Sequence, residues 1–331
     1  MKITNPYYDP AKPHHKPKGF RNPPGSPRGR RFSGELAREA AHFLGEMRRM
    51  VSDPYPFPAD HVIPETEAVA GWQSLDQPYK ANWIGHACFL LGFDGVNVLT
   101  DPYMSSYASP VPMKTTRRLV PAAIAETRLP SLDVIVVSHN HYDHLDSVSL
   151  KRLAKTHPKA QVVVPLGLKG LLLRVGFQSI TELDWYDECD VAGLRISALP
   201  AIHTSKRGIG DTNRSLWCGF SISKGQRTVY FAGDTAYGEV FRDIGARCNG
   251  FDLGLVPIGA YQPRILMKPV HCTPEEAIAI GRDVGARHLV GMHWGTIRLT
   301  TEPMLEPRDR FLQAQDSLSR QVMRIGETIA F

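Results

Sequence analysis

The chain has 331 residues, a formal net charge of +6 and a hydrophobic fraction of 42%, which fit an ordinary globular protein of one large or two small domains. No apolar run reaches the roughly 18 residues of a membrane span, and the first residues have no apolar signal core, so we expect a cytoplasmic protein. The five cysteines are odd in number and form no C-x-x-C pair, which argues against a disulfide framework or a zinc finger and predicts reduced thiols: Cys88, Cys189, Cys218, Cys248 and Cys272.

Residues 1–31 are a basic, proline-rich N-terminal extension with eight Lys or Arg, one acidic residue and seven prolines. Proline has no amide donor and disfavours helix in the residue before it, so this segment should be irregular. Three roles remain open for it: a solvated tail, a segment draped over the body, and a peripheral contact with the anionic inner face of a membrane. The rest of the chain shows no basic stripe, so we expect no nucleic-acid partner.

The next segment has the pattern of an amphipathic helix. Ser33 is a suitable cap, and Asp53-Pro54 would end the helix. The apolar positions recur at helical spacing, which predicts packing against the body and, as the minor alternative, contact with lipid: Leu36, Ala40, Phe43, Leu44, Met47 and Val51.

Short apolar runs later in the chain predict buried strands at 87–91, 96–100, 134–137, 162–164, 194–199, 228–232, 253–258 and 289–292. Helices are expected at 147–156 and 274–284, and Thr273 with Pro274 forms a strong start for the second of them. Two sheets sandwiched between helices satisfy this order of elements. A single doubly wound sheet is the alternative.

Histidines and aspartates occur just after four of these predicted strands. They follow the strands that end near residues 137, 199, 232 and 292, where loops on a rigid scaffold form sites. Packing alone explains such a repeated placement poorly. The residues are His139, His141, Asp143, His144, His203, Asp234 and His293.

Their spacing suits zinc, which binds imidazole nitrogen and carboxylate oxygen. His139 and His141, two residues apart, can hold one ion, and Asp143 and His144, past a turn, can hold a second. The set is too large for one tetrahedral catalytic ion. Two zinc ions that share Asp234 and a bridging hydroxide use all of it.

The sequence resembles the metallo-β-lactamase superfamily and, within it, the N-acylphosphatidylethanolamine-hydrolysing phospholipase D family. The H-x-H-x-D-H motif at 139–144 is shared by the superfamily, whereas Pro257-Ile258-Gly259-Ala260-Tyr261 and His293-Trp294-Gly295-Thr296 are more particular to the phospholipase branch. The matching segments span roughly residues 81–307: 83–87, 100–102, 138–146, 164–167, 182–185, 231–235, 257–261, 274–277 and 293–296.

The resemblance implies an αββα sandwich, an α/β fold, for a hydrolase domain at residues 32–331. It implies that His139, His141 and His203 hold one zinc ion, that Asp143, His144 and His293 hold the other, and that Asp234 bridges them. His271 matches a histidine near the substrate phosphate. Asp101 matches an aspartate that supports the metal ligands, with a plain turn aspartate as the alternative. His86 and Tyr261 match positions that either pack or contact substrate.

The implied function is that of a zinc-dependent phosphodiesterase of phospholipase D type, acting on N-acylphosphatidylethanolamine or a related phospholipid. Asp143 would orient the nucleophile or return a proton to the leaving alkoxide, and a protonated His271 would stabilise the phosphoryl oxygens. The segment 203–207 and the N-terminus depart from the mammalian enzymes, which leaves the lipid substrate open. A lactone, a sugar phosphate or another phosphodiester is the alternative substrate. A non-catalytic metal-binding protein and a one-metal dioxygenase are more distant alternatives, and the sequence leaves the oligomeric state open.

Overall fold

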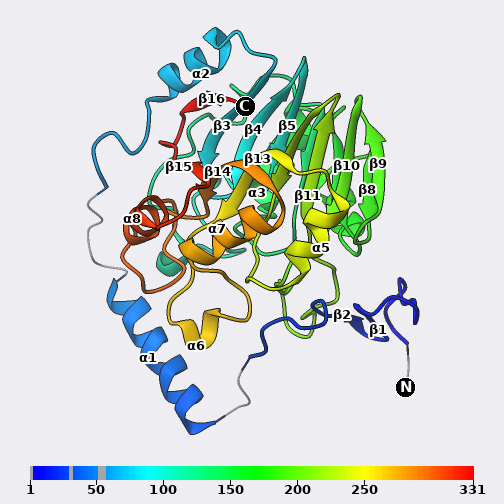
Figure 1. Cartoon of the computed structure of the whole chain (residues 1–331), viewed down its shortest axis with the longest axis vertical. Coiled ribbons are helices and arrows are strands. Elements are labelled where there is room, and N and C mark those ends of the chain that lie inside the picture. Colours follow the sequence, from blue (N-terminus) through cyan, green and yellow to red (C-terminus); the bar gives the residue numbers. More distant parts are fainter. Residues whose placement is uncertain (1–2, 30–32, 51–56) are drawn as a thin grey trace.

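Two seven-stranded sheets packed face to face form the centre of the protein (Figure 1). The computed structural model describes residues 3–29, 33–50 and 57–331. In the first sheet the spatial order is β16 (Thr328–Ala330), β3 (Tyr79–Gly85), β4 (Cys88–Phe93), β5 (Val96–Thr100), β6 (Val134–Val136), β7 (Gln161–Pro165) and β8 (Ile180–Leu183). In the second it is β15 (Ser319–Gln321), β14 (Ala286–Met292), β13 (Phe251–Pro257), β12 (Arg227–Phe231), β11 (Gly219–Lys224), β10 (Leu194–Leu199) and β9 (Glu188–Val191).

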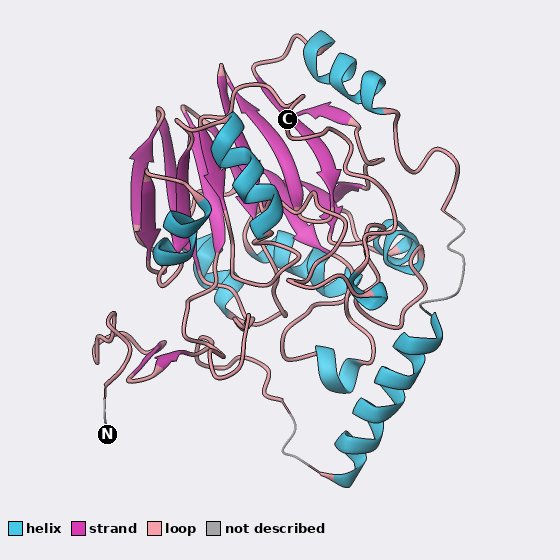
Figure 2. Ribbon diagram, turned by 180° about the vertical axis from the view of Figure 1, so that it is seen from behind, coloured by secondary structure: helices cyan, strands magenta, loops and turns pink. Residues whose placement is uncertain are grey.

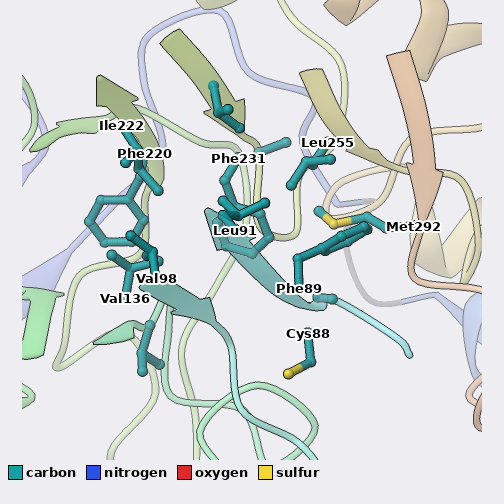
Figure 3. Packing of buried hydrophobic residues seen from close by; sticks show 14 of the residues in the cluster. Cys88, Phe89, Leu91, Val98, Val136, Phe220, Ile222, Phe231, Leu255 and Met292 are labelled. Atoms are coloured by element: carbon teal, nitrogen blue, oxygen red, sulfur yellow. The ribbon is translucent and has the colours of Figure 1, made fainter. Parts of the chain in front are cut away.

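The core lies between the two sheets. Figure 3 shows Phe89 and Leu91 of β4 next to Phe231 of β12 and Leu255 of β13, all four fully buried. Burying a large apolar side chain stabilises the folded state by about 1.5–3 kcal/mol, so this double layer is the main source of rigidity.

Helices cover both outer sides of the sandwich (Figures 1 and 2). Next to the second sheet lie α5 (Val240–Arg247) and α7 (Pro274–Asp283), with α8 (Glu306–Gln313) packed on α7. The remaining helices are α1 (Gly34–Met50), α2 (Glu65–Ser74), α3 (Ser147–Thr156), α4 (Lys169–Val175) and α6 (Arg264–Met267), with a 3-10 turn at Lys114–Thr116. Within the described ranges, no helix has the length and apolar character that crossing a bilayer requires.

Strand direction determines where the loops meet. In the first sheet β5 pairs in parallel with β6, and β3 has the same direction because both β3 and β5 are antiparallel to β4. In the second sheet β12, β13 and β14 are parallel, and β10 shares their direction. In the first sheet, therefore, β3, β5 and β6 all end at one edge, and in the second sheet β10, β12 and β14 all end at one edge. The polar residues singled out in the sequence follow these strand ends.

The N-terminal residues 3–29 pack against the body. Of the three roles left open by the sequence, this is the segment draped over the body. They contain the two-residue strands β1 (His15–Lys16) and β2 (Gly19–Phe20). Tyr7 donates a hydrogen bond to Glu182 at 2.8 Å, and the ammonium of Lys12 lies 2.6 Å from the carboxylate of Asp184.

The αββα sandwich predicted from the sequence is confirmed, and the doubly wound alternative is wrong. The strands at 96–100 and 194–199 and the helix at 147–156 have the predicted bounds, while the other predicted elements differ at their ends by one to three residues. Ser33 and Thr273 cap their helices as expected. All five cysteines are free.

The helix expected after Ser33 exists as α1, but its packing differs from the prediction. Only Met47 is buried, and Leu44 is 56% exposed, because α1 contacts little of the body besides α6. The predicted end at Asp53-Pro54, like Val51, lies outside the described residues.

Two helical glycines offer a matched test of how closely the helices pack: one in α5, which packs on α7, and one in α1. A methyl group at Gly245 of α5 would lie 2.1 Å from the carbonyl oxygen of Asp283 at the end of α7, whereas a methyl group at Gly45 of α1 would meet no atom within 4 Å. We expect Gly245→Ala to lower the free energy of unfolding by about 1–3 kcal/mol through overpacking. Gly45→Ala should raise it by up to about 1 kcal/mol through helix propensity. Urea denaturation measures both, and equal effects would contradict close α5–α7 packing.

Candidate metal centre

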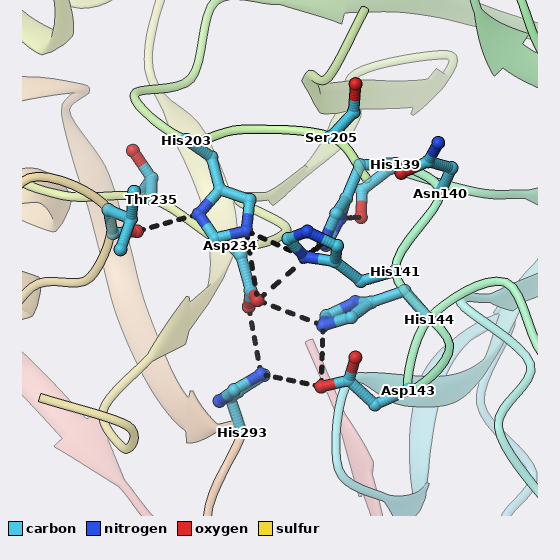
Figure 4. Close-up of polar contacts among 12 residues, drawn as sticks. His139, Asn140, His141, Asp143, His144, His203, Ser205, Asp234, Thr235 and His293 are labelled. Atoms are coloured by element: carbon cyan, nitrogen blue, oxygen red, sulfur yellow. Dashed lines mark hydrogen bonds and ion pairs between the residues drawn. The ribbon is translucent and has the colours of Figure 1, made fainter. Parts of the chain in front are cut away.

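The seven residues proposed as metal ligands meet at the carboxyl edge of the two sheets (Figure 4). The loop after β6 supplies four of them, and the segments after β10, β12 and β14 supply one each. Their ligand atoms fall into groups whose members lie within 4.8 Å of one another. One group is His139, His141, His203 and Asp234, and another is Asp143, His144 and His293 together with His86.

In the first group three imidazole nitrogens face one another. His139 Nε2 lies 2.8 Å from His141 Nδ1, which lies 3.1 Å from His203 Nε2. Nitrogens bound to one tetrahedral zinc ion would lie roughly 3.3 Å apart, so the arrangement is close to that of a ligand set. Burial, reinforced by neighbouring histidines, lowers the pKa of His139 well below its usual value, so this ring is neutral and offers a lone pair.

In the second group the carboxylate of Asp143 is the common neighbour. Its Oδ2 lies 3.1 Å from His86 Nε2 and 3.6 Å from the Nε2 atoms of both His144 and His293. Burial would raise the pKa of Asp143, but His144 and His293 outweigh it and hold the pKa well below its usual value. This carboxyl group is therefore an anion.

Asp234 lies between the two groups. Its Oδ2 is 3.8 Å from His139 Nε2, 3.7 Å from His203 Nε2 and 3.1 Å from His144 Nε2, while its Oδ1 is 3.1 Å from His293 Nε2. The carboxylate of Asp234 thus faces nitrogens of both sets: Oδ2 lies near ligand atoms of each, and Oδ1 lies near His293 of the second. Within the described chain, neither Asp234 Oδ1 nor the Nε2 atoms of His144 and His293 have a hydrogen-bond partner, although all three are buried. Buried polar atoms normally have partners, so this donor set fits cations held on both sides of Asp234.

Asp101 lies behind the proposed ligands. Its Oδ2 accepts hydrogen bonds from Ser138 Oγ and His144 Nδ1, both at 2.6 Å, and its Oδ1 accepts one from the amide of Ser138, also at 2.6 Å. A proton held on His144 Nδ1 directs Nε2 toward Asp143 and Asp234. This geometry favours the supporting role over a plain turn aspartate.

The three remaining site residues have different surroundings. His271 is partly exposed and stacks edge-on against His203, and its ligand atom lies within 4.8 Å of those of Asp234 and His293. His86 is buried and contacts Asp143, so it lies inside the site. The hydroxyl of Tyr261 donates to Glu306 of α8 at 2.8 Å, which favours a packing role for this residue.

Burial lowers the pKa of His271 to about 4, against the opposing charge of Asp234. The ring is therefore neutral near pH 7. This differs from the protonated form expected from the sequence, and a neutral imidazole can still donate one hydrogen bond.

Residues 96–294 match the model of the β-lactamase superfamily domain. The chain is 36% identical over 312 residues to the N-acyl-phosphatidylethanolamine-hydrolyzing phospholipase D 1 of Caenorhabditis elegans, covering 91% of this chain and 86% of that protein. The chain belongs to the N-acylphosphatidylethanolamine-hydrolysing phospholipase D family of the β-lactamase superfamily.

Other members and neighbours share parts of this architecture. The mitochondrial N-acyl-phosphatidylethanolamine-hydrolyzing phospholipase D of Saccharomyces cerevisiae is 37% identical over 244 residues, which are 70% of this chain and 51% of the yeast protein. The solved structure of a metallo hydrolase from the archaeon Ignicoccus hospitalis has a TM-score of 0.57 at 24% identity and covers 76% of this chain and 98% of its own, which shows the shared fold. The chain is thus a metallo-hydrolase of the β-lactamase superfamily.

Some residues that shape the site of this metallo-hydrolase carry no signal in the sequence. Ser138 gains its role only through Asp101, 37 positions earlier. The carbonyl of Val270 accepts a hydrogen bond from His203 Nδ1 at 2.8 Å, and the side-chain oxygen of Asn22 accepts one from the amide of His203 at 2.9 Å. Each of these partners is distant in sequence, so local patterns could not identify it.

The role of Asp101 can be tested by replacing its charge. Asp101→Asn should weaken metal binding by about 10–100-fold, because His144 loses the acceptor that fixes its tautomer. Asp133→Asn is the matched control: Asp133 accepts from the amide of Asn97 at the other end of β5 and β6. Competition with a chromophoric chelator measures both affinities. Equal affinities in the two variants would count against the supporting role.

Proposed function

We propose that the chain is a zinc-dependent phosphodiesterase of phospholipase D type that acts on N-acylphosphatidylethanolamine or a related phospholipid. The observation that carries this proposal is the position of Asp234 between two groups of ligand atoms: nitrogens of the first group lie 3.7 and 3.8 Å from its carboxylate, and nitrogens of the second lie 3.1 Å from it. The family relationship supports the substrate class, since the relatives in Caenorhabditis elegans and Saccharomyces cerevisiae are named for hydrolysis of this lipid.

Each ion would have its own ligands and would share one. His139, His141 and His203 would hold the first zinc ion, Asp143, His144 and His293 the second, and Asp234 both. Two zinc ions in such a site lower the pKa of a water molecule toward neutrality and neutralise charge on the phosphoryl oxygens.

The protein side chains would position the reacting groups. Asp143 is held by His86 at 3.1 Å and is an anion, so it can orient a nucleophilic water and later return a proton to the leaving alkoxide. His271 would donate a hydrogen bond to a phosphoryl oxygen as a neutral ring. The products of hydrolysis would be phosphatidic acid and an N-acylethanolamine.

Substrate would enter from the side of His141 and His271, because both are partly exposed. The six proposed metal ligands other than His141 are buried. Tyr142, next to His141, packs with Tyr103 and Ile297 and stacks under the guanidinium of Arg207 at 3.9 Å. Tyr142 thus contacts two loops, one that contains Tyr103 and one that contains Arg207. These loops carry exposed apolar side chains: Val111 (62%), Met113 (47%) and Ile209 (106%). Exposed apolar side chains in these two loops support a peripheral contact with a lipid surface.

A hydrolysis screen of the zinc-loaded protein tests the function. We expect about two zinc ions per chain by elemental analysis and, by lipid mass spectrometry, phosphatidic acid and N-acylethanolamine from N-acylphosphatidylethanolamine in vesicles. Removing the metal with a chelator should abolish turnover, and zinc should restore it. Turnover of lactones or sugar phosphates alone would replace the lipid substrate, and about one ion per chain, or iron without zinc, would contradict the two-zinc site.

Two substitutions separate the bridging position from a substrate contact. Asp234→Asn should remove metal and lower kcat/KM more than His271→Ala, which should retain both ions and lose one transition-state contact, a loss on the order of 10²–10³-fold. His288→Ala is the control, because His288 lies near the start of β14, which His293 follows, and its Nδ1 lies 2.8 Å from Ser319 Oγ. Rates and metal contents that agree between the Asp234 and His271 variants would refute this assignment.

A further inference from the structure

The loop that carries His203 is held mainly by side chains. The amide of Ile202 donates to Thr235 Oγ1 at 2.9 Å, and the amide of Ser205 donates to Asn213 Oδ1 at 3.1 Å. The amide of His203 itself donates to Asn22 Oδ1 at 2.9 Å. These three backbone amides therefore depend on side-chain acceptors outside residues 202–205, and the acceptor for His203 belongs to the N-terminal segment.

Asn22 is fixed in place by a second donor. Its Oδ1 also accepts a hydrogen bond at 3.0 Å from Nε1 of the buried Trp217, which shares this donor with the carbonyl of Ala201, also at 3.0 Å. The ring of His203 has a separate contact, since its Nδ1 donates a hydrogen bond to the carbonyl of Val270. The backbone and the ring of His203 are thus held separately, and together they direct Nε2 toward His141 and Asp234.

A buried ionic cluster anchors the same N-terminal segment to the body. His14 Nε2 lies 2.7 Å from Asp184 Oδ1, and His15 Nε2 and Lys12 Nζ lie 2.9 Å and 2.6 Å from Asp184 Oδ2. His15 Nδ1 accepts from the amide of Asp9, so Nε2 carries the proton and donates to Asp184. His14, His15 and Asp184 lie close enough together to hold a metal ion. Because the ammonium of Lys12 already occupies Asp184 Oδ2, we interpret the cluster as an anchor for the segment.

From this anchor the segment passes the loops that form the metal centre. The amide of Phe20 donates to the carbonyl of Asn213 at 2.8 Å. A methyl group on Gly238, in the loop after Asp234, would lie 4.0 Å from Pro27, and a methyl group on Gly29 would lie 3.9 Å from Pro269, just before His271. We call residues 3–29 the N-terminal strap, because they contact the segments of His203, Asp234 and His271 in turn.

We propose that the N-terminal strap completes the metal centre and that Asn22 is a positioning residue for His203. The inference rests on the proposed function in one respect, namely that His203 is a metal ligand. It gives the basic, proline-rich segment a task in the site, in addition to the membrane role that its composition suggests.

The test compares Asn22→Ala, which removes the acceptor, with Asn22→Asp, which keeps a side-chain oxygen in the same place. Asn97→Ala is the control, since Asn97 donates to the carbonyl of Ser131 at the far end of β5. The rate at which the zinc-loaded full-length protein releases metal to a chromophoric chelator is the main measurement. We expect Asn22→Ala to release one of its two ions about 10–100-fold faster than wild type, and Asn22→Asp and Asn97→Ala to behave as wild type.

Thermal unfolding of the metal-free proteins separates positioning from general stability. A lower Tm for Asn22→Ala with metal release at the wild-type rate would overturn the proposal, as would equally fast release from Asn22→Ala and Asn22→Asp. Should the alanine variant not fold, Asn22→Gln, which moves the carbonyl by one methylene, carries the same expectation. A wild-type chain that binds no metal would overturn both this inference and the proposed function, whereas two ions with identical release from all variants would overturn the strap alone.

Discussion

The carboxylate of Asp234 is the constraint on which the centre depends. It is buried, and imidazole nitrogens that follow three different strands lie within 3.8 Å of it. An isolated buried charge is costly, so this carboxylate is stable only where opposite charge surrounds it. Burial alone would raise the pKa of Asp234, yet His144 and His293 hold it well below its usual value. The two sheets must therefore deliver their loops to one place before the charge is balanced.

The scaffold also tolerates local strain at this edge. Three residues of the site that are not glycine have left-handed backbone: His86 with φ of 59°, Asp101 with 33° and His293 with 63°. Such conformations cost about 1–3 kcal/mol each and persist where neighbouring contacts enforce them. The amide of His293 donates to the carbonyl of His86 at 3.1 Å, which joins the two sheets directly at the site. Rigid strands behind these turns allow side chains to be aimed in ways that ordinary loop geometry would not favour.

The sequence predicted the fold, and it singled out seven residues that the structure brings together, for a common reason. Most of the strands that precede the proposed ligands are apolar runs, and β10 is interrupted only by Arg195 and Ser197. A histidine or aspartate after such a strand is a local pattern. The strands that were not predicted lack that pattern. In β9 (Glu188–Val191) only the last residue is buried, and β11 (Gly219–Lys224) includes Ser221, Ser223 and Lys224.

Contacts between distant residues were beyond prediction. Asn22 and His203 are 181 positions apart, and no periodicity links an asparagine in a proline-rich stretch to an amide in a distant loop. Composition described the N-terminal residues correctly as basic and irregular. It could not distinguish an irregular segment that is solvated from one whose polar groups meet Glu182 and Asp184.

The N-terminal strap also bears on the order in which the molecule assembles. Its residues are synthesised well before the groups that receive them, from Glu182 to Trp217, which come more than 160 positions later. Contacts of such long sequence separation form late, because much of the chain must be arranged before they can close. The N-terminal strap would therefore stay undocked until both sheets have formed. Its docking would be among the last steps of maturation, and the loop of His203 would reach its final position only then.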